Sequence, residues 1–237
     1  MIIVHEAPVI NRKDEFITTI IIMTIASLSV IFPLIIFKNL IVVFVLYYLI
    51  ICMAVPMIDL LIYKKMSFKD SLNYLGFSNL NIKKSVLIGF VHGIIFFSIT
   101  LIGFFIFKDT FISSDVVKSL VSWGIANSDK WIIFLLMVMF NGIIEEVFWR
   151  GYTFGKLNQV SGQWLKILLV TAFYTSYHLA TILTFFHLSL ISIQMILAVF
   201  IAGALWGWMR GKYGNTWAST IGHALATLGY MVVYLLI

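Results

Sequence analysis

The chain has 237 residues, of which 62% are hydrophobic and 11% are charged, and its mean hydropathy is +1.05. Soluble domains carry about 25% charged residues, so this composition excludes an ordinary soluble protein and indicates a helical membrane protein. A transmembrane barrel is excluded as well, because its strands alternate apolar and polar positions, whereas the apolar runs here are continuous and about 20 residues long. The net charge of +6 does not predict a nucleic-acid partner, because the basic residues of membrane proteins gather in cytoplasmic loops.

The apolar runs predict an all-α integral membrane protein with about seven spans (six to eight) in one structural domain. The runs are residues 16–37, 39–63, 85–107, 131–149, 167–186, 188–209 and 217–237. Residues 1–129 hold the first three spans, with a cytoplasmic loop at 64–84 and an external loop at 108–130. Residues 130–237 hold the other four spans and form the core of the predicted protein. The Lys-rich loop 64–84 is expected to lie along the anionic inner leaflet.

The basic residues predict the orientation of the chain. In the predicted topology, 12 of the 16 Lys and Arg residues fall on the side of the membrane that holds the N-terminus. The four on the other side are Lys38, Lys108, Lys118 and Lys130. The positive-inside rule therefore predicts a multi-pass protein of the cell membrane with a cytoplasmic N-terminus. The abundance of Ile, Lys and Asn is typical of an AT-rich bacterial genome.

Two adjacent carboxylates interrupt the fourth apolar run. Glu145 and Glu146 are the only acidic residues placed clearly within a predicted span. A charged side chain in hydrocarbon costs from about 3 to more than 10 kcal/mol, so each carboxylate needs a partner and usually has a function. Arg150 follows Glu146 by four residues, the favourable order for a helical ion pair, and is expected at the cytoplasmic boundary, where its side chain reaches water. Glu145 points about 100° away, on the face that it shares with Asn141.

The partners expected for Glu145 are two histidines in later spans. Tyr174 and His178 lie one turn apart in the fifth span, and His223 and Thr227 lie one turn apart in the seventh. At about 1.5 Å of rise per residue, Glu145 and His223 are each expected about 8–10 Å below the inner surface of the membrane. The two histidines and Glu145 can therefore meet at a similar depth.

These residues resemble the core motifs of the CAAX-protease and bacteriocin-processing (CPBP, or Abi) intramembrane protease family. The motifs lie within residues 130–235 and read Glu145-Glu146-x-x-x-Arg150, Tyr174-x-x-x-His178 and His223-x-x-x-Thr227. The resemblance implies a helical bundle around a water-filled cavity that opens to the cytoplasm, with endopeptidase cleavage in that cavity. Two positions depart from the family pattern: position 174 is Tyr where Phe is commoner, and position 227 is Thr where Asn is typical.

The resemblance also implies a role for each residue. Glu145 would activate the attacking water with His178 beside it, and His223 and the residue at position 227 would stabilise the oxyanion. Thr227 offers one donor on a shorter side chain than Asn, and losing an oxyanion donor costs about 10²–10³ in rate. The expected catalytic residues are Glu145, Glu146, His178, His223 and Thr227. The expected supporting residues are Asn141, Arg150 and Tyr174.

The sequence makes no cofactor certain, and zinc is a possible one. Zinc binds readily to two imidazoles and one carboxylate with a fourth position free, and the candidate ligands are His178, His223 and Glu145. The usual HExxH helix of zinc proteases is absent from the sequence. The sequence alone therefore leaves a metallo-type and a glutamate-type hydrolase both open.

Three functions are compatible with these residues to different degrees. The leading hypothesis is an intramembrane endopeptidase whose substrate is a membrane-associated peptide or protein, and the resemblance suggests a peptide pheromone, a bacteriocin or a leader peptide. The alternative is a catalytically weak or inactive membrane scaffold or regulator of the same fold, such as an immunity protein, and the Thr at position 227 motivates it. A proton-relay transporter is less well supported, because the spans show no paired repeats.

Overall fold

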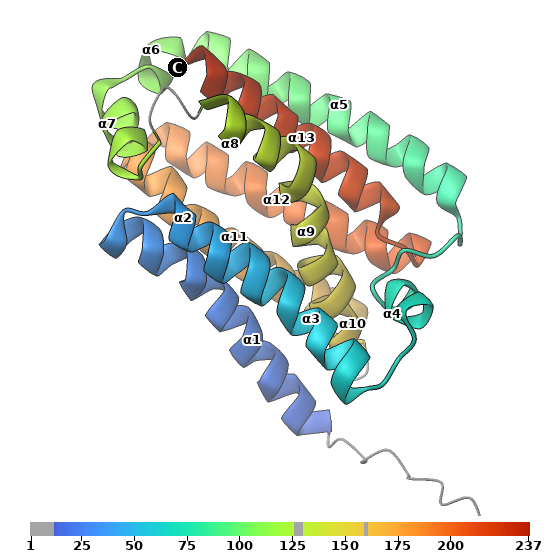
Figure 1. The fold of residues 1–237 in the computed structure, drawn as a ribbon. Coiled ribbons are helices and arrows are strands. Elements are labelled where there is room, and N and C mark those ends of the chain that lie inside the picture. The colour runs from blue at the N-terminus through green and yellow to red at the C-terminus, as the bar shows by residue number, and fades with distance from the viewer. Residues whose placement is uncertain (1–11, 126–129, 159–160) are drawn as a thin grey trace, which may run out of the picture.

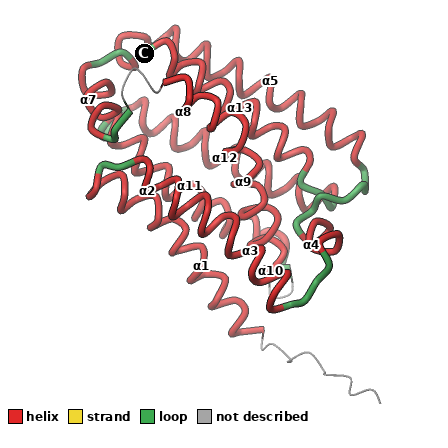
Figure 2. The backbone as a smooth tube through the Cα atoms, in the orientation of Figure 1, coloured by secondary structure: helices red, strands yellow, loops and turns green. Residues whose placement is uncertain are grey.

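The computed structural model describes residues 12–125, 130–158 and 161–237, and throughout these ranges the chain forms helices and loops without a strand (Figures 1 and 2). Seven helical segments within these ranges are long and apolar enough to cross a membrane. They are Arg12–Phe37, Leu40–Tyr63, Ile82–Ile106, Lys130–Leu157, Gln163–Phe186, Leu190–Tyr213 and Trp217–Leu236. The predicted all-α fold with seven spans is therefore confirmed. Residues 126–129 of the expected external loop lie outside the described residues.

Three of the spans are built from several helical pieces. The first span consists of α1 (Arg12–Phe32) and the π-helical η1 (Pro33–Phe37). The second consists of α2 (Leu40–Val43), η2 (Phe44–Ala54), α3 (Val55–Met57) and η3 (Ile58–Tyr63). The fourth consists of α8 (Lys130–Leu136), η5 (Met137–Asn141), α9 (Gly142–Glu146), η6 (Val147–Thr153) and α10 (Phe154–Leu157). Wide π-helical turns are frequent at functional sites, and here they flank the segment that holds both glutamates.

The other spans are continuous, and short helices lie in two of the loops. The continuous spans are α5 (Ile82–Ile106), α11 (Gln163–Phe186), α12 (Leu190–Tyr213) and α13 (Trp217–Leu236). The loop helices are α4 (Phe68–Tyr74), α6 (Lys108–Phe111) and α7 (Ser114–Ser122). Helices α4 and α10 lie toward one end of the bundle, whereas α6, α7 and the C-terminus lie at the other (Figure 1).

Helix α13 occupies a central place in the bundle. It lies against α5 on one side and against η5 and α9 of the fourth span on the other, while α1 lies against α11 (Figure 1). The last span of the chain therefore packs directly on the segment that carries the two glutamates. This packing brings His223 and Thr227, which lie on α13, toward Glu145.

The expected end of the fourth span is wrong. The helix continues through Leu157 instead of ending at residue 149, and Arg150 is fully buried at 0% exposure. Arg150 therefore does not lie at the cytoplasmic boundary with its side chain in water. Glu145 also lies further from the end of this helix than expected, about 18 Å from Leu157 at about 1.5 Å per residue. The apolar run stops at Arg150, so hydropathy placed the end of the fourth span too early. Arg150 and Lys156 are polar, but the bundle buries both of them, and the helix continues past them.

Glu15 is a second correction. The apolar run that predicts the first span begins at residue 16 and leaves Glu15 outside it, but Glu15 lies in α1, where it is buried. The Lys156 Nζ lies 3.8 Å from the Glu15 Oε1 and 3.2 Å from the Asp59 Oδ2. The ammonium group of Lys156 thus joins the fourth span to the first and second spans. Because this partner is far away in the sequence, local patterning could not reveal that Glu15 is buried.

Candidate active site

The two glutamates lie on α9, which approaches α13 closely at Gly142. A Cβ atom added at Gly142 would lie 2.8 Å from the backbone nitrogen of Ala224, closer than side chains normally approach. The absent side chain lets the two helix backbones meet, as small residues commonly do in membrane bundles. Ala224 is the residue after His223, so this contact sets the His223 imidazole beside the glutamates.

Glu146 is bonded on two sides and is fully buried. Its Oε1 accepts a hydrogen bond from Arg150 Nη1 at 2.8 Å and lies 3.1 Å from His223 Nδ1. Arg150 also donates through Nη2 to the backbone oxygen of Gly203 at 3.2 Å, and its guanidinium lies 4.4 Å from the centre of the Tyr174 ring. The predicted ion pair between Glu146 and Arg150 is therefore present, and it joins α9 and η6 to three other spans.

Glu145 is buried at 2% exposure and accepts hydrogen bonds from two tyrosines. Tyr177 donates to Oε2 at 2.6 Å, and Tyr48 donates to Oε1 at 3.2 Å. The His223 Nε2 lies 3.8 Å from Oε2, beyond hydrogen-bond distance, and its hydrogen-bond partner is the Tyr174 hydroxyl at 3.4 Å. A carboxylate has about four acceptor positions, so each oxygen of Glu145 still has a lone pair available for a water molecule.

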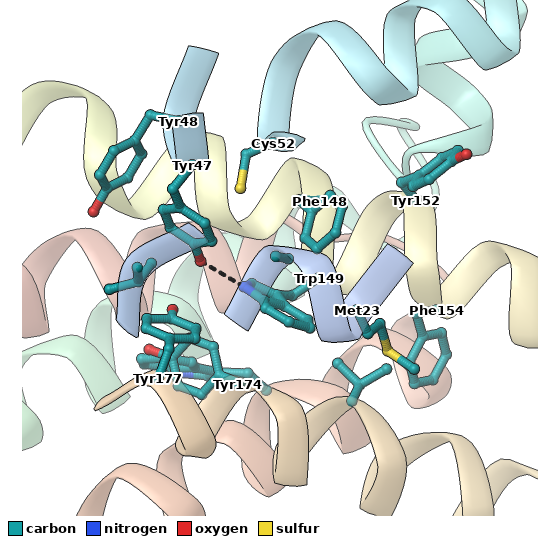
Figure 3. Close-up of a cluster of buried hydrophobic side chains, with 14 of the residues drawn as sticks. Met23, Tyr47, Tyr48, Cys52, Phe148, Trp149, Tyr152, Phe154, Tyr174 and Tyr177 are labelled. Atoms are coloured by element: carbon teal, nitrogen blue, oxygen red, sulfur yellow. Dashed lines mark hydrogen bonds between the residues drawn. The ribbon is translucent and has the colours of Figure 1, made fainter. Parts of the chain in front are cut away.

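The tyrosines around Glu145 are held by an aromatic cluster. Trp149 donates from its indole nitrogen to the hydroxyl of Tyr47 at 2.8 Å, and this bond is drawn in Figure 3. The Trp149 ring stacks on Tyr177 with an interplanar angle of 16°. Tyr47 in turn contacts Tyr48 edge to face. These contacts fix the rings, and so they fix the direction in which the two hydroxyl groups meet Glu145.

His178 lies beside the site without bonding to Glu145 in the described contacts. Its Nδ1 lies 2.8 Å from the backbone oxygen of Tyr174. Because a carbonyl only accepts, the hydrogen is on Nδ1, and Nε2 of the neutral ring is left as an acceptor. The imidazole lies against Tyr174 and Tyr177, with ring centres 4.6 and 4.3 Å apart. His178 is half-buried, so it is the more accessible of the two histidines.

Asn141 and Thr227 bond to each other next to Glu145. The Asn141 Nδ2 donates to the Thr227 Oγ1 at 3.1 Å and to the Tyr230 hydroxyl at 3.2 Å. The Tyr48 hydroxyl that reaches Glu145 also donates to Asn141 Oδ1. Asn141 therefore lies on the same face as Glu145, as predicted, and the two share a tyrosine instead of bonding directly.

The candidate zinc ligands do not assemble into a metal site. Within the described part of the chain, no three His, Cys, Asp and Glu side chains are arranged so that they could hold a metal ion. The Nδ1 of His223 is engaged by Glu146, and the Nδ1 of His178 is engaged by its own helix. The described geometry therefore does not fit a zinc ion held by His178, His223 and Glu145.

Two cavities lie away from these residues. One of about 290 Å³ is lined by Asp59, Tyr152 and Lys156 among others, and one of about 410 Å³ is lined by residues such as Phe44, Trp123 and Leu136. Neither is lined by a glutamate or histidine of the site. The expected water-filled cavity therefore does not correspond to either of these two cavities.

The comparison with family models matches the part of the chain that carries this site. Residues 127–229 match the family described as type II CAAX prenyl endopeptidase Rce1-like. This segment is similar to the Rce1-like family. The match confirms the resemblance read from the motifs and spans Glu145, Glu146 and both histidines. A comparison with curated proteins and one with solved structures each returned no match.

The sequence interpretation missed three tyrosines, Tyr48, Tyr177 and Tyr230, all of which reach the polar network of the site. Tyr48 comes from the second span, which lies outside the Rce1-like segment. Tyrosines are usual at the edges of a membrane, so a tyrosine in the middle of a predicted span is the signal that could have found them. A hydroxyl group placed at that depth needs a buried partner.

Proposed function

We propose that this protein is an intramembrane endopeptidase that hydrolyses a peptide bond in a membrane-associated peptide or protein. The observation that supports this most directly is the environment of Glu145. A buried carboxylate accepts bonds from two tyrosines and lies 3.8 Å from the imidazole of His223, within an Rce1-like segment. Peptide hydrolysis requires such a base, a second group that carries a proton, and donors for the oxyanion.

In the first step, Glu145 accepts a proton from a water molecule as the water oxygen attacks the scissile carbonyl carbon. The carbonyl electrons move to oxygen, which becomes the oxyanion. His178 accepts through its Nε2 and orients this water, because that nitrogen is the one its own helix leaves free. Tyr48 and Tyr177 hold the carboxylate in one orientation, so that the base is in place before the substrate arrives.

In the second step, the oxyanion collapses, the C–N bond breaks, and the leaving amine takes a proton. His223 transfers this proton from Glu145 to the amine through Nε2, which faces Glu145 while Nδ1 faces Glu146. The negative charge of Glu146 stabilises the imidazolium during the transfer, and Arg150 holds Glu146 in place. A positioned acid or base of this kind contributes about 10²–10⁴ in rate.

A cellular experiment tests the function even while the substrate is unidentified. Membranes and medium from cells that produce the wild type, Glu145→Gln, or no protein would be compared by quantitative mass spectrometry of peptide termini. We expect new termini in short apolar peptides that form only with the wild type. Identical sets of termini in all three samples would contradict an endopeptidase.

The scaffold alternative is favoured by one observation, which is that Thr227 stands in place of the family Asn. A triple variant, Glu145→Gln, His178→Ala and His223→Ala, separates the two functions. If a cellular phenotype of the deleted protein is rescued by this variant as well as by the wild type, then the protein acts as a scaffold. We expect no rescue, because each substitution removes a group that the hydrolysis uses.

A further inference from the structure

A chain of hydrogen bonds runs from Glu145 through Tyr48 and Asn141 to Tyr230. The one proton of the Tyr48 hydroxyl is shared between Asn141 Oδ1 and Glu145 Oε1, and Asn141 Nδ2 donates to the hydroxyl of Tyr230. Thr227 accepts the other amide hydrogen of Asn141. The cluster of Asn141, Thr227 and Tyr230 is thus one hydroxyl group away from the proposed catalytic base.

The direction of these bonds is fixed by their chemistry. An amide oxygen only accepts, so the bond from Tyr48 turns Asn141 Oδ1 toward the second span and its NH₂ group toward α13. Tyr230 accepts one of the two amide hydrogens, and neither of the Asn141 bonds uses the proton of Tyr230. A hydroxyl group that accepts a hydrogen bond becomes a stronger donor, because bonds in a chain polarise one another.

Burial distinguishes Tyr230 from the rest of the cluster. Asn141 and Thr227 are 4% and 0% exposed, and Glu145 is 2% exposed, whereas Tyr230 is 39% exposed. Its hydroxyl oxygen meets Asn141 inside the bundle, while much of its ring remains accessible. The ring of Tyr230 therefore lies at the surface of the bundle, and its hydroxyl group points inward to the cluster beside the proposed base.

We infer that Tyr230 is a catalytic residue that donates a hydrogen bond to the oxyanion, and that Asn141 and Thr227 are positioning residues that orient it. The inference rests on the proposed endopeptidase function. The water proton goes to Glu145 and the carbonyl electrons go to oxygen, so Tyr230 keeps its own proton and only shares it. The Thr at position 227 then does not remove the oxyanion donor, because the donor is the hydroxyl of Tyr230, three residues further along α13.

The decisive variant is Tyr230→Phe, which removes the hydroxyl group and keeps the ring. The assay uses purified full-length protein in lipid vesicles, with a synthetic precursor of a peptide whose cleavage in cells depends on Glu145. We expect kcat to fall about 10²–10³-fold, the range for one oxyanion donor, with KM within about threefold of the wild type. Tyr234→Phe, one turn further along α13, is the matched control and should keep kcat within about twofold.

A variant pair tests the positioning role of Thr227. Thr227→Val removes the acceptor for Asn141 and is expected to lower kcat without raising KM, while Thr227→Ser restores most of the rate. A loss of folded protein would lower both variants alike, so thermal unfolding in detergent is measured in parallel. If Thr227→Val and Thr227→Ser have equal kcat, the positioning role is wrong.

The outcomes separate this inference from the function on which it rests. If Tyr230→Phe keeps kcat within about threefold of the wild type while Glu145→Gln is inactive, then Tyr230 is not the oxyanion donor and the endopeptidase function stands. If Glu145→Gln also cleaves the precursor at the wild-type rate, then the proposed function fails and the inference fails with it.

Discussion

The Nδ1 of His223 lies 3.1 Å from the Oε1 of Glu146, and this contact joins α13 to α9 across the centre of the site. A carboxylate only accepts, so Nδ1 carries a hydrogen, and the other nitrogen, Nε2, lies 3.8 Å from Glu145 and 3.4 Å from the Tyr174 hydroxyl. The two glutamates therefore have different environments around one imidazole. Glu146 is bonded to Arg150 and His223, whereas Glu145 is bonded to tyrosine hydroxyls that leave it able to accept a proton.

Replacement of Glu146 by Gln tests this relationship. A Gln oxygen can still accept from Arg150 and His223, so the bonds are kept and only the negative charge is lost. We expect kcat to fall by an amount within the range of about 10²–10⁴ that a positioned acid–base group contributes, because the imidazolium loses its counter-charge. The control is Asp115→Asn, which changes an exposed carboxylate that lies 3.8 Å from His187. Equal kcat in the two variants would contradict this role of Glu146.

Replacement of Arg150 by Met tests the structural role of the buried ion pair. The substitution leaves Glu146 as an uncompensated buried charge, and breaking a buried pair in this way costs about 3–5 kcal/mol. We expect a lower free energy of unfolding, measured by denaturant titration in mixed micelles. Arg12→Met, at an exposed position of α1, is the matched control. A stability of Arg150→Met equal to that of Arg12→Met would show that the pair does not stabilise the fold.

Replacement of Lys156 by Met tests the contact between the first, second and fourth spans. Lys156 lies 3.2 Å from Asp59 and 3.8 Å from Glu15, and losing a bond to a charged group costs about 1.5–3 kcal/mol. We expect a loss of stability of this size with unchanged kcat per folded molecule. Because Glu15 is then left unpaired, adding Glu15→Gln should recover part of the loss. Lys83→Met, at an exposed position, is the control. If the double variant Lys156→Met with Glu15→Gln is less stable than Lys156→Met alone, the pairing of Lys156 with Glu15 is contradicted.

The sequence predicted the spans because hydrocarbon imposes a long apolar run on each of them. It failed where polar residues are buried by the protein itself. Arg150 and Lys156 end the apolar run of the fourth span at residue 149, yet the helix continues to Leu157 because their partners lie inside the bundle. Glu15 lies outside the predicted first span for the same reason, since its partner is on another span.

The candidate site was predictable in part. The spacing of Glu146 and Arg150 within one helix predicts their ion pair, because residues four apart lie on the same face. The bonds of Glu145 were not predictable in this way, because Tyr48 comes from a different span and no local spacing relates the two.

The orientation of the protein in the membrane remains a prediction from the basic residues. It can be tested with single cysteines, because Cys52 is the only cysteine in the chain and is fully buried. In a Cys52→Ala background, Lys118→Cys should react with a membrane-impermeant maleimide in intact cells. Lys83→Cys should react only after the membrane is permeabilised, because the rule places it in the cytoplasm. The reverse pattern of labelling would invert the topology.

The central claim is that Glu145 is the base that activates water, and its most direct test is the rate of cleavage by Glu145→Gln in lipid vesicles. The reaction would be run in H₂¹⁸O with the synthetic precursor peptide, and the new C-terminus would be followed by mass spectrometry. We expect the wild type to place one ¹⁸O in the new carboxylate and Glu145→Gln to be slower by about 10²–10⁴-fold while it remains folded. A folded Glu145→Gln that incorporates ¹⁸O within about threefold of the wild-type rate would contradict the claim.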